Sequence, residues 1–182
     1  MSIIESLVLD ACCGAEKIYQ GWNKRLGDNF IGIDIRKGDF SYSGENNWTK
    51  NEVLIKPTVL ANMTALPFKD HVFDCIICDP PHLKCGENSH MAKYYGSWSQ
   101  TDIIRTMRGA NSEFARVMKP SATLILKILP EKLPLYQTLL KNFYFFLPIY
   151  TKRLRGSMKN PKGEKDAALW AVGLRCSDVC LS

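Results

Sequence analysis

The hydrophobic residues of this chain gather in short runs that alternate with polar, glycine-bearing segments. Seven runs have the length and composition of strands: residues 6–11, 29–35, 58–61, 72–78, 122–128, 143–150 and 167–174. Three segments favour helices instead: residues 15–24, 99–118 and 135–142. The segment from 36 to 56 is polar and predicts no clear element.

The helix predicted over residues 99–118 rests on apolar residues at helical spacing. These residues are Ile103, Ile104, Met107, Phe114, Val117 and Met118. Lys119-Pro120 should end this helix, because the residue before a proline is disfavoured in the helical conformation.

Strands that are apolar along their whole length and alternate with helices are typical of a parallel sheet covered on both faces. The last two strands are separated by a basic segment without a predicted helix, which indicates a hairpin. The chain therefore predicts an α/β fold. We expect a three-layer α/β/α, Rossmann-like sandwich with a mostly parallel seven-stranded sheet and one antiparallel strand in a C-terminal hairpin. Ligands of such sheets bind at the carboxyl ends of the strands, near the topological switch point.

The composition agrees with a single folded domain over residues 1–182. Hydrophobic residues make up 46% and charged residues 23%, which excludes a disordered chain, a collagen-like chain and a small disulfide scaffold. No apolar run approaches the about 20 residues of a membrane helix, and the first residues do not resemble a secretory signal. We therefore expect a cytoplasmic protein.

Two of the seven cysteines, Cys75 and Cys78, have a spacing that also occurs in zinc and redox sites. In an extended segment, residues three apart point to opposite faces, so these two thiolates would not converge on one metal ion. We expect no metal site there.

The positive charge of the chain is concentrated near its C-terminal end. The net charge is +6, and residues 151–166 carry six lysines and arginines against two acids, which amounts to +4. Gly156, Pro161 and Gly163 predict a loop in this segment. Such a loop either contacts a phosphate backbone or is a solvated hairpin tip, and the sequence favours neither reading.

Candidate binding residues follow three of the predicted strands. Gly14 comes soon after Asp10, and a glycine lets the backbone turn tightly beside a ligand. Asp34 ends the second strand, where a carboxylate can accept hydrogen bonds from both hydroxyls of an adenosine ribose. Asp79-Pro80-Pro81-His82 follows the fourth long strand, and its two prolines stiffen a turn that is rich in acceptors. Each signal alone is weak, but their order along the chain is informative.

Together these segments resemble a class I S-adenosylmethionine-dependent methyltransferase over about residues 7–174. Residues 66–74 and 116–120 are also similar to segments typical of these enzymes. The resemblance implies S-adenosylmethionine as cofactor. Its binding residues would be Asp10, Ala11, Cys12, Gly14, Asp34, Ile35, Asn62, Met63 and Asp79. Glu16 stands where the family usually has a second glycine, and Asn62 where it usually has an acid.

Asp79-Pro80-Pro81-His82 resembles the (Asp/Asn)-Pro-Pro-aromatic motif of the branch that methylates amino nitrogens, mostly on nucleic-acid bases. The resemblance implies that these four residues are catalytic. Asp79 and the Pro80 carbonyl would accept hydrogen bonds from the two amine N–H groups, and His82 would stack on the flat methyl acceptor. Tyr94, Tyr95 and Trp98 follow in a glycine-bearing segment, either as a substrate-binding lid or as a small cluster packed under the loop.

These features lead to an enzyme that methylates an exocyclic amino nitrogen of a base in RNA or DNA. Lys152, Arg153 and Arg155 would contact the nucleic acid. Because this length leaves no room for a recognition domain, we expect either structured RNA as substrate or a partner protein that supplies recognition. Two alternatives stay open. One is an N-methyltransferase that acts on a protein glutamine or a small molecule. The other is a cofactor-binding or nucleic-acid-binding module without turnover, with Glu16 as a sign of decay.

Overall fold

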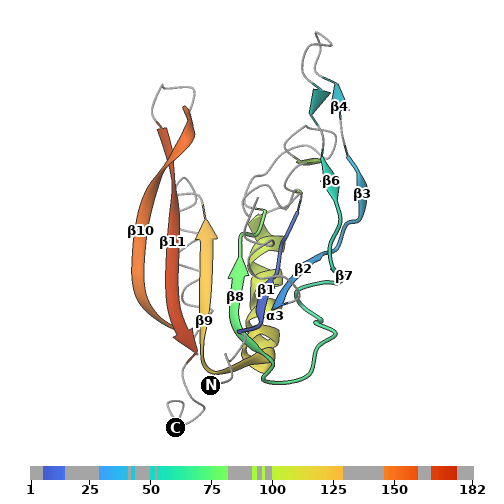
Figure 1. The fold of residues 1–182 in the computed structure, drawn as a ribbon. Coiled ribbons are helices and arrows are strands. Elements are labelled where there is room, and N and C mark those ends of the chain that lie inside the picture. Colours follow the sequence, from blue (N-terminus) through green and yellow to red (C-terminus); the bar gives the residue numbers. More distant parts are fainter. Residues whose placement is uncertain are drawn as a thin grey trace.

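The centre of the computed structural model is a seven-stranded sheet (Figure 1). The structure describes residues 6–14, 29–40, 42–43, 50–51, 53–81, 92–93, 96, 100–128, 146–159 and 165–175. The sheet consists of β1 (Val8–Asp10), β2 (Phe30–Asp34), β7 (Val59–Leu60), β8 (Phe73–Cys78), β9 (Met118–Ile128), β10 (Phe146–Lys159) and β11 (Lys165–Arg175). Each strand overlaps one of the seven predicted runs, although β9 begins before residue 122 and β10 continues past residue 150.

The strand order is β10-β11-β9-β8-β1-β2-β7. Neighbours from β7 to β9 pair in parallel, whereas β11 pairs antiparallel with both β9 and β10. The predicted mostly parallel α/β sheet with one antiparallel strand in a C-terminal hairpin is therefore confirmed. The chain runs outward from β1 to one edge and returns to β8, so the topological switch point lies between β1 and β8.

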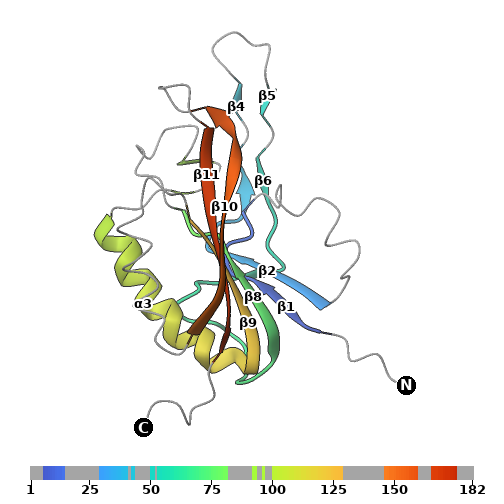
Figure 2. The same ribbon diagram turned by 90° about the vertical axis from the view of Figure 1, so that its left-hand side faces the viewer.

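Helix α3 (Gln100–Val117) lies against one face of the sheet (Figure 2). Ile103, Met107 and Phe114 are buried in the main core with strand residues such as Ile76 and Leu124. The helix ends directly before Met118-Lys119-Pro120, as expected from the proline. The apolar stripe of the sequence is thus the face that α3 buries.

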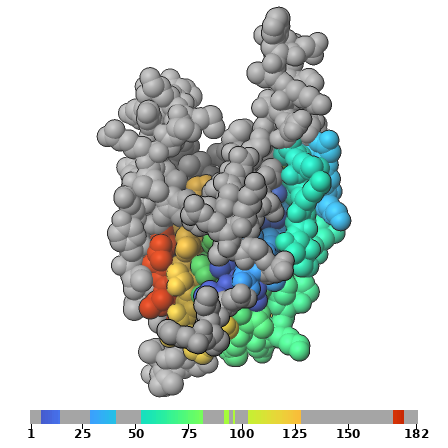
Figure 3. Space-filling view, viewed as in Figure 1, coloured from blue at the N-terminus to red at the C-terminus, as the bar shows by residue number. Residues whose placement is uncertain are grey.

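A smaller cluster of Val8, Phe30 and Ile77 lies on the other face of the sheet. Figure 3 shows this side, with residues of β11, β9, β8, β1 and β2 side by side. The predicted helices over residues 15–24 and 135–142 lie outside the described residues.

Arg116, in the last turn of α3, forms hydrogen bonds with the turn that precedes β8. Its guanidinium donates to both carboxylate oxygens of Glu113, at 2.9 and 2.8 Å, and to the carbonyl oxygens of Leu66 and Phe68, at 2.9 and 2.7 Å. It also donates to Asp70 at 2.8 Å, and the Leu66 N–H donates to Glu113 at 2.6 Å. The two segments that resemble methyltransferases, 66–74 and 116–120, are thus parts of one hydrogen-bonded unit.

This unit predicts how stability depends on pH. The hydrogen bonds from Arg116 hold the pKa of Glu113 below its ordinary value of 4.5, despite partial burial, and the Leu66 N–H adds to the effect. Because the folded-state pKa is lowered, the stabilisation is present above pH 4.5 and is lost as the pH falls below that value. Glu113→Gln should lower Tm by about 2–4 °C at pH 7. Thermal unfolding as a function of pH should show this difference shrinking below pH 4.5; a difference that persists there would contradict the assignment.

Residues 36–56, for which the sequence predicted no element, contain four short strands. β3 (Gly38–Asp39) pairs with β6 (Leu54–Ile55), and β4 (Tyr42–Ser43) pairs with β5 (Lys50–Asn51). In Figure 1 they form an arm that extends past the carboxyl ends of the parallel strands. Val53 and Ile55 are fully buried, whereas Leu54 is exposed, so the arm follows strand alternation over too few residues to stand out in the sequence.

The prediction of a basic loop over residues 151–166 is wrong for most of its length. Residues up to Lys159 belong to β10, and β11 begins at Lys165. The pairing is irregular between Arg155 and Lys159. Gly156 therefore lies at a bulge within the hairpin, which is a common place for a glycine in a strand. A second irregularity follows Pro148 on this edge strand, where a proline is tolerated.

Two further sequence expectations concern the cysteines and membrane segments. Cys78 is part of the main core, whereas Cys75 packs against the smaller cluster, so the two thiols do point to opposite faces. No group of metal-ligating side chains occurs within the part of the chain that the structure describes. Among those same residues, no helix has the length and apolar character needed to cross a membrane.

Candidate active site

Three carboxylates meet at the carboxyl ends of adjacent strands. Asp10 ends β1, and its register partners are Gly32 on β2 and Ile77 on β8. Asp34 and Asp79 each follow their strand's partner of Asp10 by two residues. Asp10 and Asp79 therefore flank the topological switch point, where ligands of open α/β sheets bind, and Asp34 lies one strand further along.

The turn after β1 is held by backbone and carboxylate hydrogen bonds. Asp10 is fully buried, and its Oδ1 accepts a bond from the Cys12 N–H at 3.1 Å. The Ala11 N–H donates to the Ile77 carbonyl at 2.9 Å, and the Gly14 N–H donates to Asp34 Oδ2 at 3.2 Å. Gly14 has a φ of 52°, in the left-handed region that favours glycine. The turn thus brings the first and second candidate segments together.

Arg36 donates hydrogen bonds to Asp34, the predicted ribose-binding carboxylate. Its backbone N–H and its Nε donate to Asp34 Oδ1 at 2.8 and 3.1 Å, and its Nη2 donates to Oδ2 at 3.2 Å. With the Gly14 N–H, four donors surround Asp34, which is about the number that one carboxylate accepts. A ribose diol can therefore bind Asp34 only by displacing the Arg36 guanidinium.

The surface beside Asp34 suits an adenosine group in other respects. Ile35 is 58% exposed and Leu60, the register partner of Asp34, is 60% exposed, so two large apolar side chains border the carboxylate. Asn62 is exposed, and its Oδ1 accepts the Thr64 N–H at 3.0 Å, which leaves its amide N–H groups as donors. Met63 is buried in the main core, so contacts from this residue to a ligand would come from its backbone.

Arg36 also connects the cofactor region with the segment that follows the Asp-Pro-Pro motif. Its Nη1 donates to the carbonyls of Lys93, at 3.2 Å, and Ala92, at 3.5 Å. Gly96 lies against both Arg36 and Pro81, because a Cβ at this glycine would be 3.8 Å from Cζ of Arg36 and 3.2 Å from Cγ of Pro81. Arg36 therefore contacts both the predicted ribose site and the approach to the catalytic motif.

The predicted catalytic motif begins at Asp79, whose carboxylate pairs with a lysine. Lys127, near the end of β9, forms an ion pair with Asp79 Oδ2, and the two side chains are only 18% and 10% exposed. Pro80 is buried and Pro81 is half-buried. His82 lies outside the described residues. The described part of the motif is a rigid corner beside the switch point.

The predicted substrate-binding residues fall in two regions. Tyr94, Tyr95 and Trp98 lie outside the described residues. Lys152, Arg153 and Arg155 lie on the edge strand β10, not in a loop. Lys152 is the register partner of Trp170, and Trp170 is the register partner of Lys127. A row of paired positions thus leads across the sheet from the basic edge strand to Lys127.

Cys12, in the turn after β1, and Cys75, on β8, both have raised thiol pKa values. A hydrogen bond with Cys78, followed by burial and the nearby charges of Cys78, Asp10 and Asp34, raises the pKa of Cys12 well above its ordinary value. Burial and the charge of Asp74 raise the pKa of Cys75 to about 11. Since the thiolate is the nucleophile and the metal ligand, these two residues are poorly suited to either role at neutral pH.

Two of these site residues, Arg36 and Lys127, were not singled out from the sequence. Lys127 did carry a signal, because it is the one charged residue in the apolar run 122–128, and a charge in a buried strand requires a partner. Arg36 follows Asp34 by two positions, but this spacing alone does not reveal that its guanidinium folds back onto the acid.

Comparison with known proteins agrees with this arrangement. Residues 9–80, from β1 to the Asp-Pro-Pro corner, match the family model of a methyltransferase domain. A SAM-dependent methyltransferase from Methanosarcina mazei has a similar structure, with a TM-score of 0.60 and 16% identity over 97% of this chain and 95% of that chain. No curated protein matches the sequence.

Two further solved structures show what this fold can carry. One is the N-methyltransferase NodS from Bradyrhizobium japonicum in complex with S-adenosyl-l-homocysteine, with a TM-score of 0.55 and 11% identity over 94% of this chain and 79% of that chain. Another is a mutant of the 16S rRNA (adenine(1408)-N(1))-methyltransferase from Catenulisporales acidiphilia, with a TM-score of 0.56 and 10% identity over 96% and 87%. At these identities the likeness concerns the fold.

Proposed function

We propose that this class I S-adenosylmethionine-dependent methyltransferase transfers the methyl group to an exocyclic amino nitrogen of a base in RNA or DNA. The observation that carries the proposal is the corner at Asp79-Pro80-Pro81. It directly follows β8, next to the switch point, and presents acceptors on a backbone stiffened by two prolines.

The chemistry of the acceptor explains why such a corner is needed. The lone pair of an exocyclic base amine is delocalised into the ring, so the amine is a poor nucleophile. When bound, S-adenosylmethionine supplies an electrophilic methyl group. The chain contributes acceptors: Asp79 and the Pro80 carbonyl would each accept a hydrogen bond from one amine N–H, which localises the lone pair and holds the nitrogen within about 3–3.5 Å of the methyl carbon. Asp79 acts as an acceptor and orienting group, since the methylated ammonium product loses its proton readily.

Several features support a nucleic-acid substrate. The edge strand β10 contains Lys152, Arg153, Arg155 and Lys159, which are suited to phosphate contacts. The row of paired positions from Lys152 to Lys127 joins this strand to the catalytic corner. One structurally similar protein is an rRNA methyltransferase. A partner protein that supplies recognition and a cytosolic location belong to the same proposal.

The test is methyl transfer from radiolabelled S-adenosylmethionine to ribosomal RNA, transfer RNA, DNA, total protein and a small-molecule extract. We expect label in the exocyclic amine of a nucleoside after digestion of RNA or DNA. Label only in protein or small molecules would replace the nucleic-acid assignment with the other N-methyltransferase reading. Binding without transfer to any acceptor would favour a module without turnover.

A further inference from the structure

Lys127 is a largely buried cation near the end of β9, where it follows three apolar residues, 124–126. Leu124 and Leu126 of β9 are buried in the main core, and Ile125 packs against the smaller cluster on the opposite face. Because neighbouring strand residues alternate between faces, Lys127 lies on the face of Ile125. Leu126 is the register partner of Cys78, so Lys127 is level with Asp79, with which it pairs. The alternation of β9 thus delivers the ammonium group to the catalytic corner.

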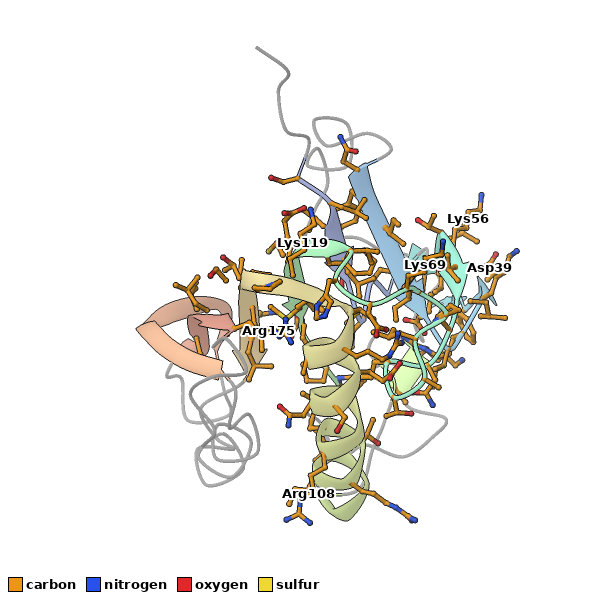
Figure 4. The ribbon with its side chains drawn as sticks, turned by 90° about the horizontal axis from the view of Figure 1, so that it is seen from below. Asp39, Lys56, Lys69, Arg108, Lys119 and Arg175 are labelled. Carbon is orange, nitrogen blue, oxygen red and sulfur yellow. The ribbon has the colours of Figure 1, made fainter. Side chains whose placement is uncertain are left out.

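The same two strands carry a second lysine–aspartate pair, which allows a comparison. At the other end of the sheet, Lys119 of β9 donates to both oxygens of Asp74 of β8, at 2.9 and 2.8 Å. Figure 4 looks onto that edge, with Lys119 labelled. These side chains are 39% and 28% exposed, against 18% and 10% for Lys127 and Asp79. An exposed pair contributes little, whereas breaking a buried pair leaves an uncompensated charge.

We propose that Lys127 is the positioning residue for Asp79, an inference that rests on the proposed function. Its ammonium group holds Oδ2 of Asp79 and compensates the buried charge, so that the carboxylate keeps one orientation at the corner. Lys127 thereby acts on the substrate amine through Asp79. The substrate amine then meets a carboxylate whose position is fixed before the substrate binds. This is the condition for electrostatic preorganisation.

The first test uses the protein without cofactor or substrate. Lys127→Met and Asp79→Asn should each raise the unfolding equilibrium constant about tenfold or more, because each leaves a buried charge without its partner. The double variant removes both charges and should be more stable than Lys127→Met alone. This coupling is measured by a double-mutant cycle in urea. If the change in the unfolding equilibrium constant of the double variant equalled the product of the two single changes to within twofold, the pairing would be overturned. This outcome does not depend on the substrate.

The second test measures kinetics with the acceptor found in the transfer assay. Lys127→Met should lower kcat about 100-fold and change KM for S-adenosylmethionine less than about threefold, since the cofactor contacts are retained. Asp79→Asn/Lys127→Met should regain about tenfold over Lys127→Met, because a neutral amide needs no counter-charge. Lys119→Met is the matched control, with kcat within about threefold of the parent protein. A kcat for Lys127→Met equal to that of Lys119→Met, or a double variant no better than Lys127→Met, would overturn the positioning role. If the proposed function were wrong, the parent protein itself would transfer no methyl group to RNA or DNA. The double-mutant cycle in urea would still show whether Lys127 and Asp79 interact.

Discussion

Asp79→Ala is expected to reduce methyl transfer about 1,000-fold or more, while the Kd for S-adenosylmethionine changes less than about threefold. Loss of one preorganised hydrogen-bonding group at a reacting centre costs about 100- to 1,000-fold in kcat. This substitution also leaves the Lys127 ammonium buried beside the position of the reacting amine, which adds to the loss. The effect should therefore appear in kcat rather than in cofactor binding.

Single-turnover transfer and calorimetric titration with S-adenosylmethionine measure these two effects separately. Asp74→Ala is a suitable control. Asp74 also pairs with a lysine, but it lies near the start of β8, whereas Asp79 follows the end of this strand. Its transfer rate should stay within about threefold of the parent rate. If Asp79→Ala retained full transfer, the corner would not be the site of the chemistry.

The second large effect concerns the carboxylate of Asp34. Asp34→Ala should raise the Kd for S-adenosylmethionine about 30- to 100-fold, since hydrogen bonds to a charged acceptor contribute about 1.5–3 kcal/mol. Arg36→Met should act in the opposite direction and lower this Kd about three- to tenfold. The reason is that the guanidinium occupies both carboxylate oxygens that the ribose hydroxyls would need.

Calorimetry of the three proteins at one ionic strength checks the two opposite signs. Lys37→Met, which removes a neighbouring exposed charge, serves as the control and should leave the Kd within about twofold. If Arg36→Met weakened binding as strongly as Asp34→Ala, the guanidinium would be holding the carboxylate in place for the ribose rather than competing with it.

The sheet could be predicted from the sequence because its strands are continuous apolar runs. Residues 72–78 and 122–128 are mostly apolar, so hydrophobic content alone located β8 and the second half of β9. The arm over residues 36–56 escaped prediction, since its strands are two residues long and no apolar period can develop over such a length. The basic hairpin was misread because glycine and proline residues indicated a loop, whereas pairing with β11 keeps residues up to Lys159 extended.

The convergence of three acids at one end of the sheet was predictable from the sequence. Asp10 and Asp34 end apolar strands and Asp79 directly follows one, and a parallel sheet brings such ends together. The ion pair of Lys127 and the clamp of Arg36 on Asp34 depend on strand register and on side-chain conformation. Register is fixed by pairing between segments far apart in sequence, as for Lys127 and Asp79, which a local pattern does not contain.

Because residues of β9 alternate between the two faces of the sheet, this protein is sensitive to a change in the length of that strand. Leu126 and Lys127 are consecutive, one facing the main core and the other the catalytic corner. Deleting a single residue between Leu124 and Lys127 would exchange these directions, sending an ammonium group into the core and an aliphatic side chain to the acid. The same alternation of side chains in this strand therefore serves both the core and the Asp79 corner. An insertion or deletion there would disturb both.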